Sequence, residues 1–262
     1  MEIPLFPLHM VLCPGIVLPL HVFEDRYRAM TRRCLDSGEP FGVVLIRDGR
    51  EIGTKGVATL AGVGAFAEIR EAGRYPDGRY DLLAAATGRF AIESVDSQKE
   101  PYLLAEVTRL DDEVGDEPRA ERLAAAAIRA FVRYLDLMRA RDGESTEALD
   151  IRVEIDASPD VIESTIDDDA APGEPEIERS GSTERPTRND LVIPDDPTVL
   201  SYLLSGIVQV ELPRRQALLE AETTVERLEG LIALLERELT LLSRRLRFFT
   251  PDPRILGGAR RS

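Results

Sequence analysis

The first half of the chain alternates apolar and polar residues in short runs, a pattern typical of β-strands. Turn sequences such as Asp48-Gly49, Pro76-Asp77-Gly78 and Thr87-Gly88 stand between the runs. The predicted strands are 41–46, 65–69, 80–84, 90–95 and 102–110. Short strands punctuated in this way predict a small, mostly antiparallel barrel or sandwich.

One helix is predicted ahead of these strands. Phe23, Tyr27, Met30 and Cys34 recur at spacings of four, three and four, which places them on one helix face. Gly38 follows, and glycine can end a helix in the left-handed conformation. We expect this face, Phe23 included, to pack on the barrel.

The second half of the chain has helical periodicity. An apolar stripe begins after Pro118, a residue tolerated in the first turn of a helix. Its members are Leu123, Ala127, Phe131, Leu135 and Met138. A further helix is predicted from Asp196-Pro197, a capping residue followed by a first-turn proline, and a shorter one after Pro213. These signals predict a small helical bundle.

The clearest helix start is Thr223-Thr224-Val225-Glu226, a capping box in which the first and last side chains each accept a hydrogen bond from the other's backbone amide. A long amphipathic helix is predicted to follow. Its apolar stripe contains Leu228, Leu231, Leu235, Leu239, Leu242 and Leu246.

An acidic segment separates the predicted helices. The net charge of the chain is −15, and residues 142–196 alone carry 18 acidic residues and 4 arginines. Apart from residues 151–155, which alternate like a strand, this segment has no lasting apolar period and many helix breakers. Such a composition predicts a disordered acidic linker, with a nucleic-acid mimic or a docking tail as the alternative.

The predicted fold class is α+β, a mostly antiparallel β barrel or sandwich with one packed helix, followed by a small α-helical bundle. The expected divisions are a β domain at 1–115, the first helix of the helical subdomain at 116–141, the acidic linker at 142–195, the helical bundle at 196–250 and a flexible C-terminal tail at 251–262. No apolar run approaches the roughly 20 residues of a membrane span, and no secretion signal opens the chain. We therefore expect a cytoplasmic protein with no membrane partner.

Signatures of catalysis are missing from the sequence. There is no phosphate-binding G-x-x-x-x-G-K-[ST] motif, and the nearest fragment, Gly53-Thr54-Lys55-Gly56, lacks both its spacing and its hydroxyl. Neither histidine lies in a nucleophile motif, and the chain's two lysines, Lys55 and Lys99, lie in turns or loops. We expect no enzyme activity, no catalytic residues and no cofactor.

The cysteines and histidines raise the question of a metal site. His9, Cys13, His21 and Cys34 are all of these residues that the chain has. Their intervals match no usual paired zinc spacing, and both cysteines lie in apolar surroundings. The sequence therefore disfavours a metal centre.

The opening motifs have a recognisable order. They are Pro4-Leu5-Phe6-Pro7-Leu8, then Val11-Leu12-Cys13-Pro14-Gly15, then Leu18-Pro19-Leu20-His21-Val22-Phe23-Glu24-Asp25-Arg26-Tyr27. Later motifs include Pro40-Phe41-Gly42-Val43-Val44-Leu45, Gly88-Arg89-Phe90, Leu212-Pro213 and Thr223-Thr224. Together they resemble the substrate-binding N-terminal domain of the Lon protease family. Cys13, Ala65 and the acidic insertion depart from the family pattern and leave its docking details open.

The resemblance implies a PUA-like pseudo-barrel followed by a helical bundle. It also implies non-catalytic recognition of unfolded or damaged polypeptide, as a stand-alone Lon-type substrate-binding protein linked to proteolysis. The partners would be unfolded or misfolded polypeptide and a protease or chaperone. The alternatives are an RNA-binding PUA-like module and a small-molecule-binding barrel. A near-neutral folded part and an aromatic content of 5% disfavour nucleic acid.

The candidate peptide-binding residues are Phe23, Glu24, Arg26 and Tyr27, in the groove where the barrel meets the predicted helix. A structural reading of the opening motif competes with the functional one. Apolar residues such as Phe23 would supply core, and the four prolines would fix φ and block edge pairing. Glu24 would complement the helix dipole, whereas Arg26 would pair with a carboxylate or face a ligand.

Overall fold

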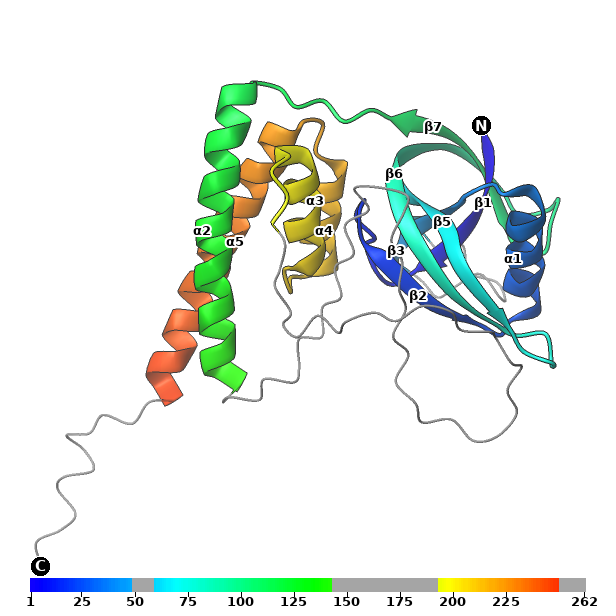
Figure 1. Cartoon of the computed structure of the whole chain (residues 1–262), viewed down its shortest axis with the longest axis horizontal. Helices are drawn as coiled ribbons and strands as arrows, with labels where there is room; N and C mark the ends of the chain where they lie inside the picture. The colour runs from blue at the N-terminus through cyan, green and yellow to red at the C-terminus, as the bar shows by residue number, and fades with distance from the viewer. Residues whose placement is uncertain (49–58, 143–192, 250–262) are drawn as a thin grey trace, which may run out of the picture.

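The computed structural model describes residues 1–48, 59–142 and 193–249. Its strands are β1 (Glu2–Leu8), β2 (Val17–Val22), β3 (Phe41–Asp48), β4 (Thr59–Leu60), β5 (Val63–Arg74), β6 (Tyr80–Asp96) and β7 (Leu103–Leu110). Its helices are α1 (Asp25–Ser37), α2 (Glu117–Asp142), α3 (Pro197–Ile207), α4 (Leu212–Glu220) and α5 (Thr224–Phe249). In Figure 1 the strands and α1 form one side of the molecule and α2 to α5 the other. The fold is α+β, as predicted.

The sheet closes into a barrel. Its strand order is β1-β7-β6-β5-β3-β4, and a parallel pairing of β1 with β3 completes the ring. β2 adds to β6 outside this path. Inside the ring, α1 contributes Tyr27, Met30 and Cys34 to a core shared with Phe41 and Leu82. Burial of this helix face on the barrel confirms the prediction of one packed helix.

The prolines of β1 lie within paired stretches of the strand. β1 pairs with β7 over residues 2–5 and with β3 over residues 5–8. Pro4 lies opposite Leu104, and Pro7 lies opposite Val44. Because the two ladders meet at Leu5, each proline has a partner strand on one side only, and its missing N–H can face the open side.

The sequence Thr87-Gly88 is not a turn, because β6 continues through it as one long strand. The register with β5 shifts there, so that Phe66 pairs with Gly88 and Ala67 with Ala86. Thr87 is thus the extra residue of a β-bulge. A bulge bends a strand and increases its twist, which lets β6 curl around the barrel and pair with β5, β7 and β2.

Phe23 does not belong to the core, contrary to the prediction. Helix α1 begins at Asp25, after Glu24 in extended conformation, so Phe23 lies before the first turn and off the helical stripe. Its side chain is 62% exposed. Gly38 ends α1 in the left-handed conformation at φ 70°, as its sequence signal predicted.

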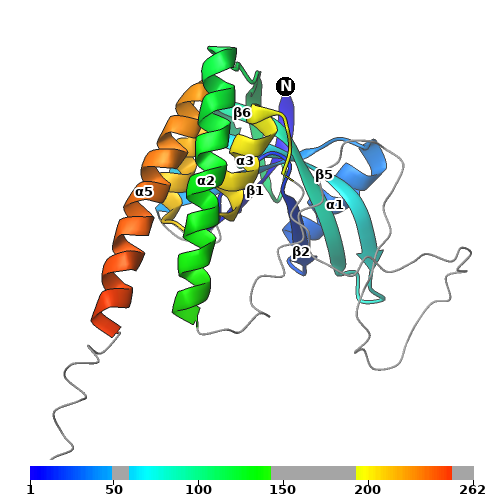
Figure 2. The same cartoon turned by 60° about the vertical axis from the view of Figure 1, so that its left-hand side comes forward.

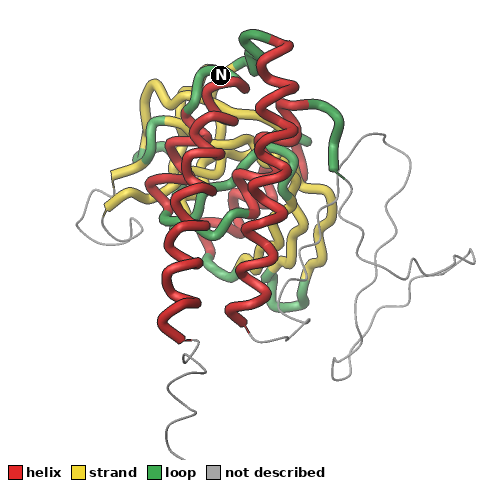
Figure 3. Tube along the Cα trace, turned by 90° about the vertical axis from the view of Figure 1, so that its left-hand side faces the viewer, coloured by secondary structure: helices red, strands yellow, loops and turns green. Residues whose placement is uncertain are grey.

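The helix caps of the bundle match their sequence signals. The Asp196 side chain accepts hydrogen bonds from the backbone amides of Thr198 and Val199 at the start of α3. The Thr223 hydroxyl accepts from the Glu226 amide at 3.1 Å, and the Glu226 carboxylate accepts from the Thr223 amide at 3.4 Å. Helices α2 and α5 then run side by side, as Figure 3 shows from the bundle side.

Two buried arginines join the barrel to the bundle. Arg89 of β6 and Arg227 of α5 are 2% and 0% exposed. Arg89 donates to the carbonyls of Leu219 and Ala221 at 2.9 and 2.7 Å, and Arg227 donates to the carbonyls of Leu218 and Ala221 at 3.2 and 3.3 Å. These carbonyls end α4, whose last turn has no helical partners for them. Both positive charges lie at the negative end of the helix dipole. Arg89 fixes α4 against the barrel, while Arg227 fixes α4 to α5 and lies 3.9 Å from Asp112, which follows β7.

One carboxylate completes this junction. Asp112, which follows β7, accepts from Arg89 Nε at 3.1 Å and from the Tyr202 hydroxyl. The guanidinium carbon of Arg227 lies 3.8 Å above the centre of the Tyr202 ring. Burial lowers the pKa of Arg227 from its ordinary value. The buried charges are thus balanced by one carboxylate, helix carbonyls and an aromatic face.

The acidic linker predicted at 142–195 and the tail at 251–262 fall almost entirely outside the described residues, as does the strand-like run at 151–155. Within the described residues, no helix has the length and apolar character needed to cross a membrane.

Candidate functional site

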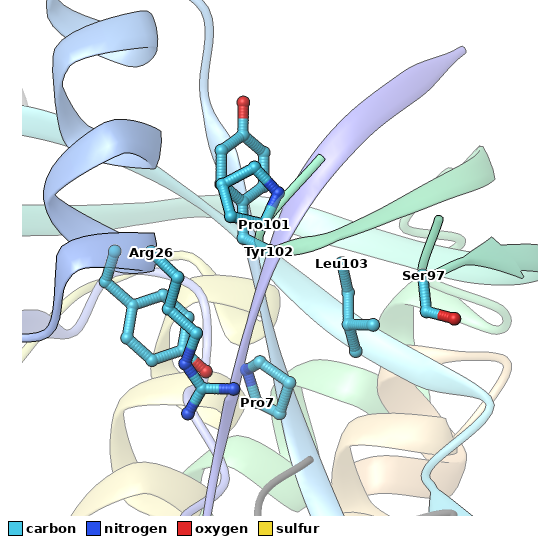
Figure 4. A pocket seen from close by; sticks show the side chains of 7 residues that line it. Pro7, Arg26, Ser97, Pro101, Tyr102 and Leu103 are labelled. Carbon is cyan, nitrogen blue, oxygen red and sulfur yellow. The ribbon is translucent and has the colours of Figure 1, made fainter. Parts of the chain in front are cut away.

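A pocket opens beside the first turn of α1, in the groove that the sequence suggested. We call it the Tyr27 pocket. Its cavity volume is about 60 Å³. Its lining comes from β1, α1, β7 and the segment before β7, namely Pro7, Arg26, Tyr27, Ser97, Pro101, Tyr102 and Leu103. Figure 4 shows Arg26 beside Pro7 at one side and Ser97 and Leu103 at the other.

The charged wall of the Tyr27 pocket is held in place. Arg26 Nε donates to Glu24 Oε2 at 2.9 Å, and the Arg26 guanidinium carbon lies 4.4 Å from the centre of the Tyr27 ring. Tyr27 is buried and stacks on Phe6 with ring centres 4.1 Å apart. An apolar floor with one charged rim can hold an apolar side chain and orient the polar backbone beside it.

A second feature lies at the other side of the α1 start. We call it the Phe23 patch, and it consists of Phe23, His21 and Tyr75. Phe23 and Tyr75 are 62% and 40% exposed, among the most exposed large apolar side chains of the described structure. The His21 ring centre lies 6.1 Å from each of the other two ring centres. The chain thus presents a group of aromatic rings to solvent.

Hydrogen bonds to one carboxylate fix two of these rings. The Tyr75 hydroxyl donates to Asp81 Oδ2 at 2.5 Å, and His21 Nδ1 lies 2.6 Å from Asp81 Oδ1. The Tyr75 hydrogen bond, and after it that of His21, lowers the pKa of Asp81 below its usual value. The same bond raises the pKa of Tyr75. Asp81 therefore remains a carboxylate at neutral pH and holds the two rings at the surface.

The four predicted site residues divide between the two features. Arg26 and Tyr27 line the pocket, and Glu24 contacts it through Arg26. Phe23 belongs to the patch and is not among the residues that line the pocket. Sequence reasoning missed His21 and Tyr75 as surface groups. Tyr75 had a usable signal, because it immediately precedes the turn sequence Pro76-Asp77-Gly78, where a side chain is seldom buried.

The cysteines and histidines are separated in the structure. Cys13 and Cys34 are free thiols in different core clusters, and burial raises the pKa of each to about 11. Across residues 1–48, 59–142 and 193–249, no three His, Cys, Asp or Glu side chains are grouped closely enough to hold a metal ion.

Comparison with known proteins assigns the family. The model of the ATP-dependent protease La (LON) substrate-binding domain matches residues 2–237. The Lon protease of Escherichia coli strain K12 is 25% identical over 242 residues, which are 92% of this chain and 25% of the relative. Lon protease 2 of Syntrophobacter fumaroxidans is 29% identical over 129 residues, 49% of this chain and 16% of the relative. The chain thus spans about a quarter of the length of the full-length relatives it matches.

Solved structures show the same fold. The Lon N-terminal domain protein from Xanthomonas campestris superposes with a TM-score of 0.53 at 22% identity, covering 89% of this chain and 98% of the other. The N-terminal domain of the Mycobacterium avium complex Lon protease gives a TM-score of 0.52 at 18% identity, covering 90% and 98%. The match over nearly the whole described structure includes both the barrel and the helical bundle.

Proposed function

The chain belongs to the LON substrate-binding domain family, and from that premise we propose that it recognises unfolded or damaged polypeptide without catalysing a reaction on it. The Phe23 patch carries the proposal. The Tyr75 and His21 rings are held at the surface by hydrogen bonds to Asp81, and the Phe23 ring is held there by the extended backbone before α1. Exposed aromatic groups of this kind mark interaction sites, because water solvates them poorly.

The properties of the patch fit a partner without fixed structure. Aromatic rings bury a large apolar area against many different side chains, so they select for exposed apolar groups and tolerate different sequences. The Tyr27 pocket, at the other side of the α1 start, can take a second side chain of the same extended polypeptide. Arg79 lies over the Tyr75 ring, 5.2 Å from its centre, but it pairs with Asp77, and Asp81 adds a second carboxylate, so the patch has no excess positive charge to attract a polyanion.

The proposed setting follows from the same chemistry. Bound polypeptide would pass to a protease or chaperone, since the sequence contains no phosphate-binding motif or nucleophile arrangement of its own. The two free, buried thiols favour a reducing, cytoplasmic location. Binding should be weak and tolerant of sequence, with dissociation constants in the micromolar to millimolar range, about −8 to −4 kcal/mol, because a flexible chain loses entropy on docking.

The test is a titration of reduced, carboxymethylated α-lactalbumin, a permanently unfolded polypeptide, followed by fluorescence anisotropy. The double variant Phe23→Ser with Tyr75→Ser should weaken binding about tenfold or more, because two exposed rings are lost. The control is Val95→Ser, which removes an apolar side chain that is 45% exposed on β6. Equal affinity of the wild type and both variants would contradict a role for the patch.

A further inference from the structure

The outer half of β5 has an unpaired edge among the described residues. β5 extends from Val63 to Arg74, but β3 pairs only with its residues 65–67. Beyond that point β5 is bonded to β6 alone, in a hairpin that Figures 1 and 2 show reaching away from the helical bundle. Residues 70–74 are all exposed. An unpaired edge presents a row of N–H and C=O groups to its surroundings.

The register shows which main-chain groups face outward. The Tyr75 amide donates to the Arg79 carbonyl at 3.0 Å, so these residues form a hydrogen-bonded pair at the end of the hairpin. Such pairs alternate along an antiparallel ladder, so Gly73, opposite Asp81, bonds toward β6. Ala72 and Arg74 therefore direct their N–H and C=O groups away from β6.

Side chains leave this edge accessible. Ala72 and Gly73 are the smallest residues of the outer half of β5, and the guanidinium of Arg74 lies over the Tyr80 ring, 5.9 Å from its centre. The charges along the edge alternate in sign through Glu68, Arg70, Glu71 and Arg74. Because both signs of charge are present, this edge does not strongly repel acidic or basic partners. Charged side chains also disfavour stable pairing of the edge with the same edge of a second copy.

The unpaired edge of β5 ends next to the Phe23 patch. Arg74 is followed by Tyr75, whose ring belongs to the Phe23 patch. A strand bonded to Ala72 and Arg74 would therefore have one end at the hairpin tip, next to the exposed rings. The main chain of a bound polypeptide and its apolar side chains would meet two adjacent surfaces of one hairpin.

We propose that the β5 edge binds an extended segment of unfolded polypeptide by strand addition, through the outward main-chain groups of Ala72 and Arg74. This inference rests on the proposed function and names its binding mode. Main-chain hydrogen bonds carry no side-chain requirement, so they provide affinity for any unpaired, extended sequence without proline at the bonded positions. Most strands of a folded protein are already paired, so it offers few such segments.

Amide hydrogen exchange in the wild-type protein tests the binding mode. The amides of Ala72 and Arg74 should become protected when reduced, carboxymethylated α-lactalbumin is added, whereas that of Gly73, already bonded to β6, should change little. No change at Ala72 and Arg74 at saturating polypeptide would overturn strand addition. Protection of both amides without polypeptide, increasing with protein concentration, would also overturn it in favour of pairing between two copies of this chain.

A pair of variants at one position tests the same contact by affinity. Ala72→Pro removes the outward N–H and leaves the bonds of Gly73 to β6, whereas Ala72→Val keeps that N–H. We expect Ala72→Pro to weaken binding about fivefold or more, the effect of one main-chain hydrogen bond, and Ala72→Val to leave it unchanged. Unchanged binding by Ala72→Pro, with loss in the Phe23 and Tyr75 double variant, overturns strand addition but not the proposed function. Absence of binding by the wild type overturns both.

Discussion

Replacing Arg227 by methionine tests the junction between barrel and bundle. Arg227 is fully buried and donates to the Leu218 carbonyl, the Ser201 hydroxyl and the Ala221 carbonyl at 3.2, 3.1 and 3.3 Å. Methionine fills a similar space but donates nothing. Arg227→Met therefore leaves two carbonyls at the end of α4 and the Ser201 hydroxyl of α3 without this partner, although Arg89 still donates to the Ala221 carbonyl.

The magnitude follows from opposing contributions. An acceptor left buried and unpaired costs about 1–3 kcal/mol. All three acceptors lose Arg227, and two of them, the Leu218 carbonyl and the Ser201 hydroxyl, are then left without a guanidinium donor. Removing the charge also removes the free-energy cost of burying it, and this cost is what lowers the pKa of Arg227. We expect the free energy of unfolding to fall by about 3 kcal/mol after this offset.

Urea unfolding followed by circular dichroism measures this change. The control is Arg237→Met on the same helix, because Arg237 is exposed and pairs only loosely with Glu238 at 3.4 Å. Its effect should stay within about 0.5 kcal/mol. If Arg227→Met also remains within about 1 kcal/mol of the wild type, the assignment of the buried arginines as the caps of α4 is wrong.

Two further predictions concern the barrel core. Cys13 and Cys34, whose pKa values burial raises to about 11, should not react with a thiol reagent at pH 8 until denaturant is added, and rapid reaction of either in the native protein would show that it is accessible. Gly64→Ala should destabilise the barrel by about 1–3 kcal/mol, because the added Cβ would lie 2.5 Å from a backbone oxygen of β3. The control Gly62→Ala should be neutral, because its Cβ would meet nothing within 4 Å. Equal effects of the two variants in thermal unfolding would contradict the close packing at Gly64.

Local signals in the sequence predicted local structure well. The end of α1 at Gly38, the Asp196 cap and the Thr223 capping box all appear where their residues indicated, because each depends on groups within four positions. The turn predicted at Thr87-Gly88 was wrong. Whether a glycine interrupts a strand depends on the partner strand beside it, and Gly88 pairs with Phe66, about 20 residues away in the sequence.

The four predicted site residues remain a prediction, and the structure places them in two features. The groove beside α1 was predicted from two curved surfaces meeting there, and Arg26 and Tyr27 line its pocket. Phe23 was placed in the core because its spacing continues the helical stripe, but the helix begins two residues later. His21 and Tyr75 lie 54 positions apart and meet only through the pairing of β2 with β6, which no periodicity of either segment reveals.

The most direct test of polypeptide recognition compares one protein in two states. Native α-lactalbumin and its reduced, carboxymethylated form are titrated with the wild-type chain by fluorescence anisotropy, at about 50 and about 200 mM salt, alongside a structured RNA. We predict binding of the unfolded form alone, with micromolar to millimolar affinity that changes little with salt. Equal binding of the native and unfolded forms, or salt-sensitive binding of the RNA with none of the unfolded polypeptide, would contradict the proposed function.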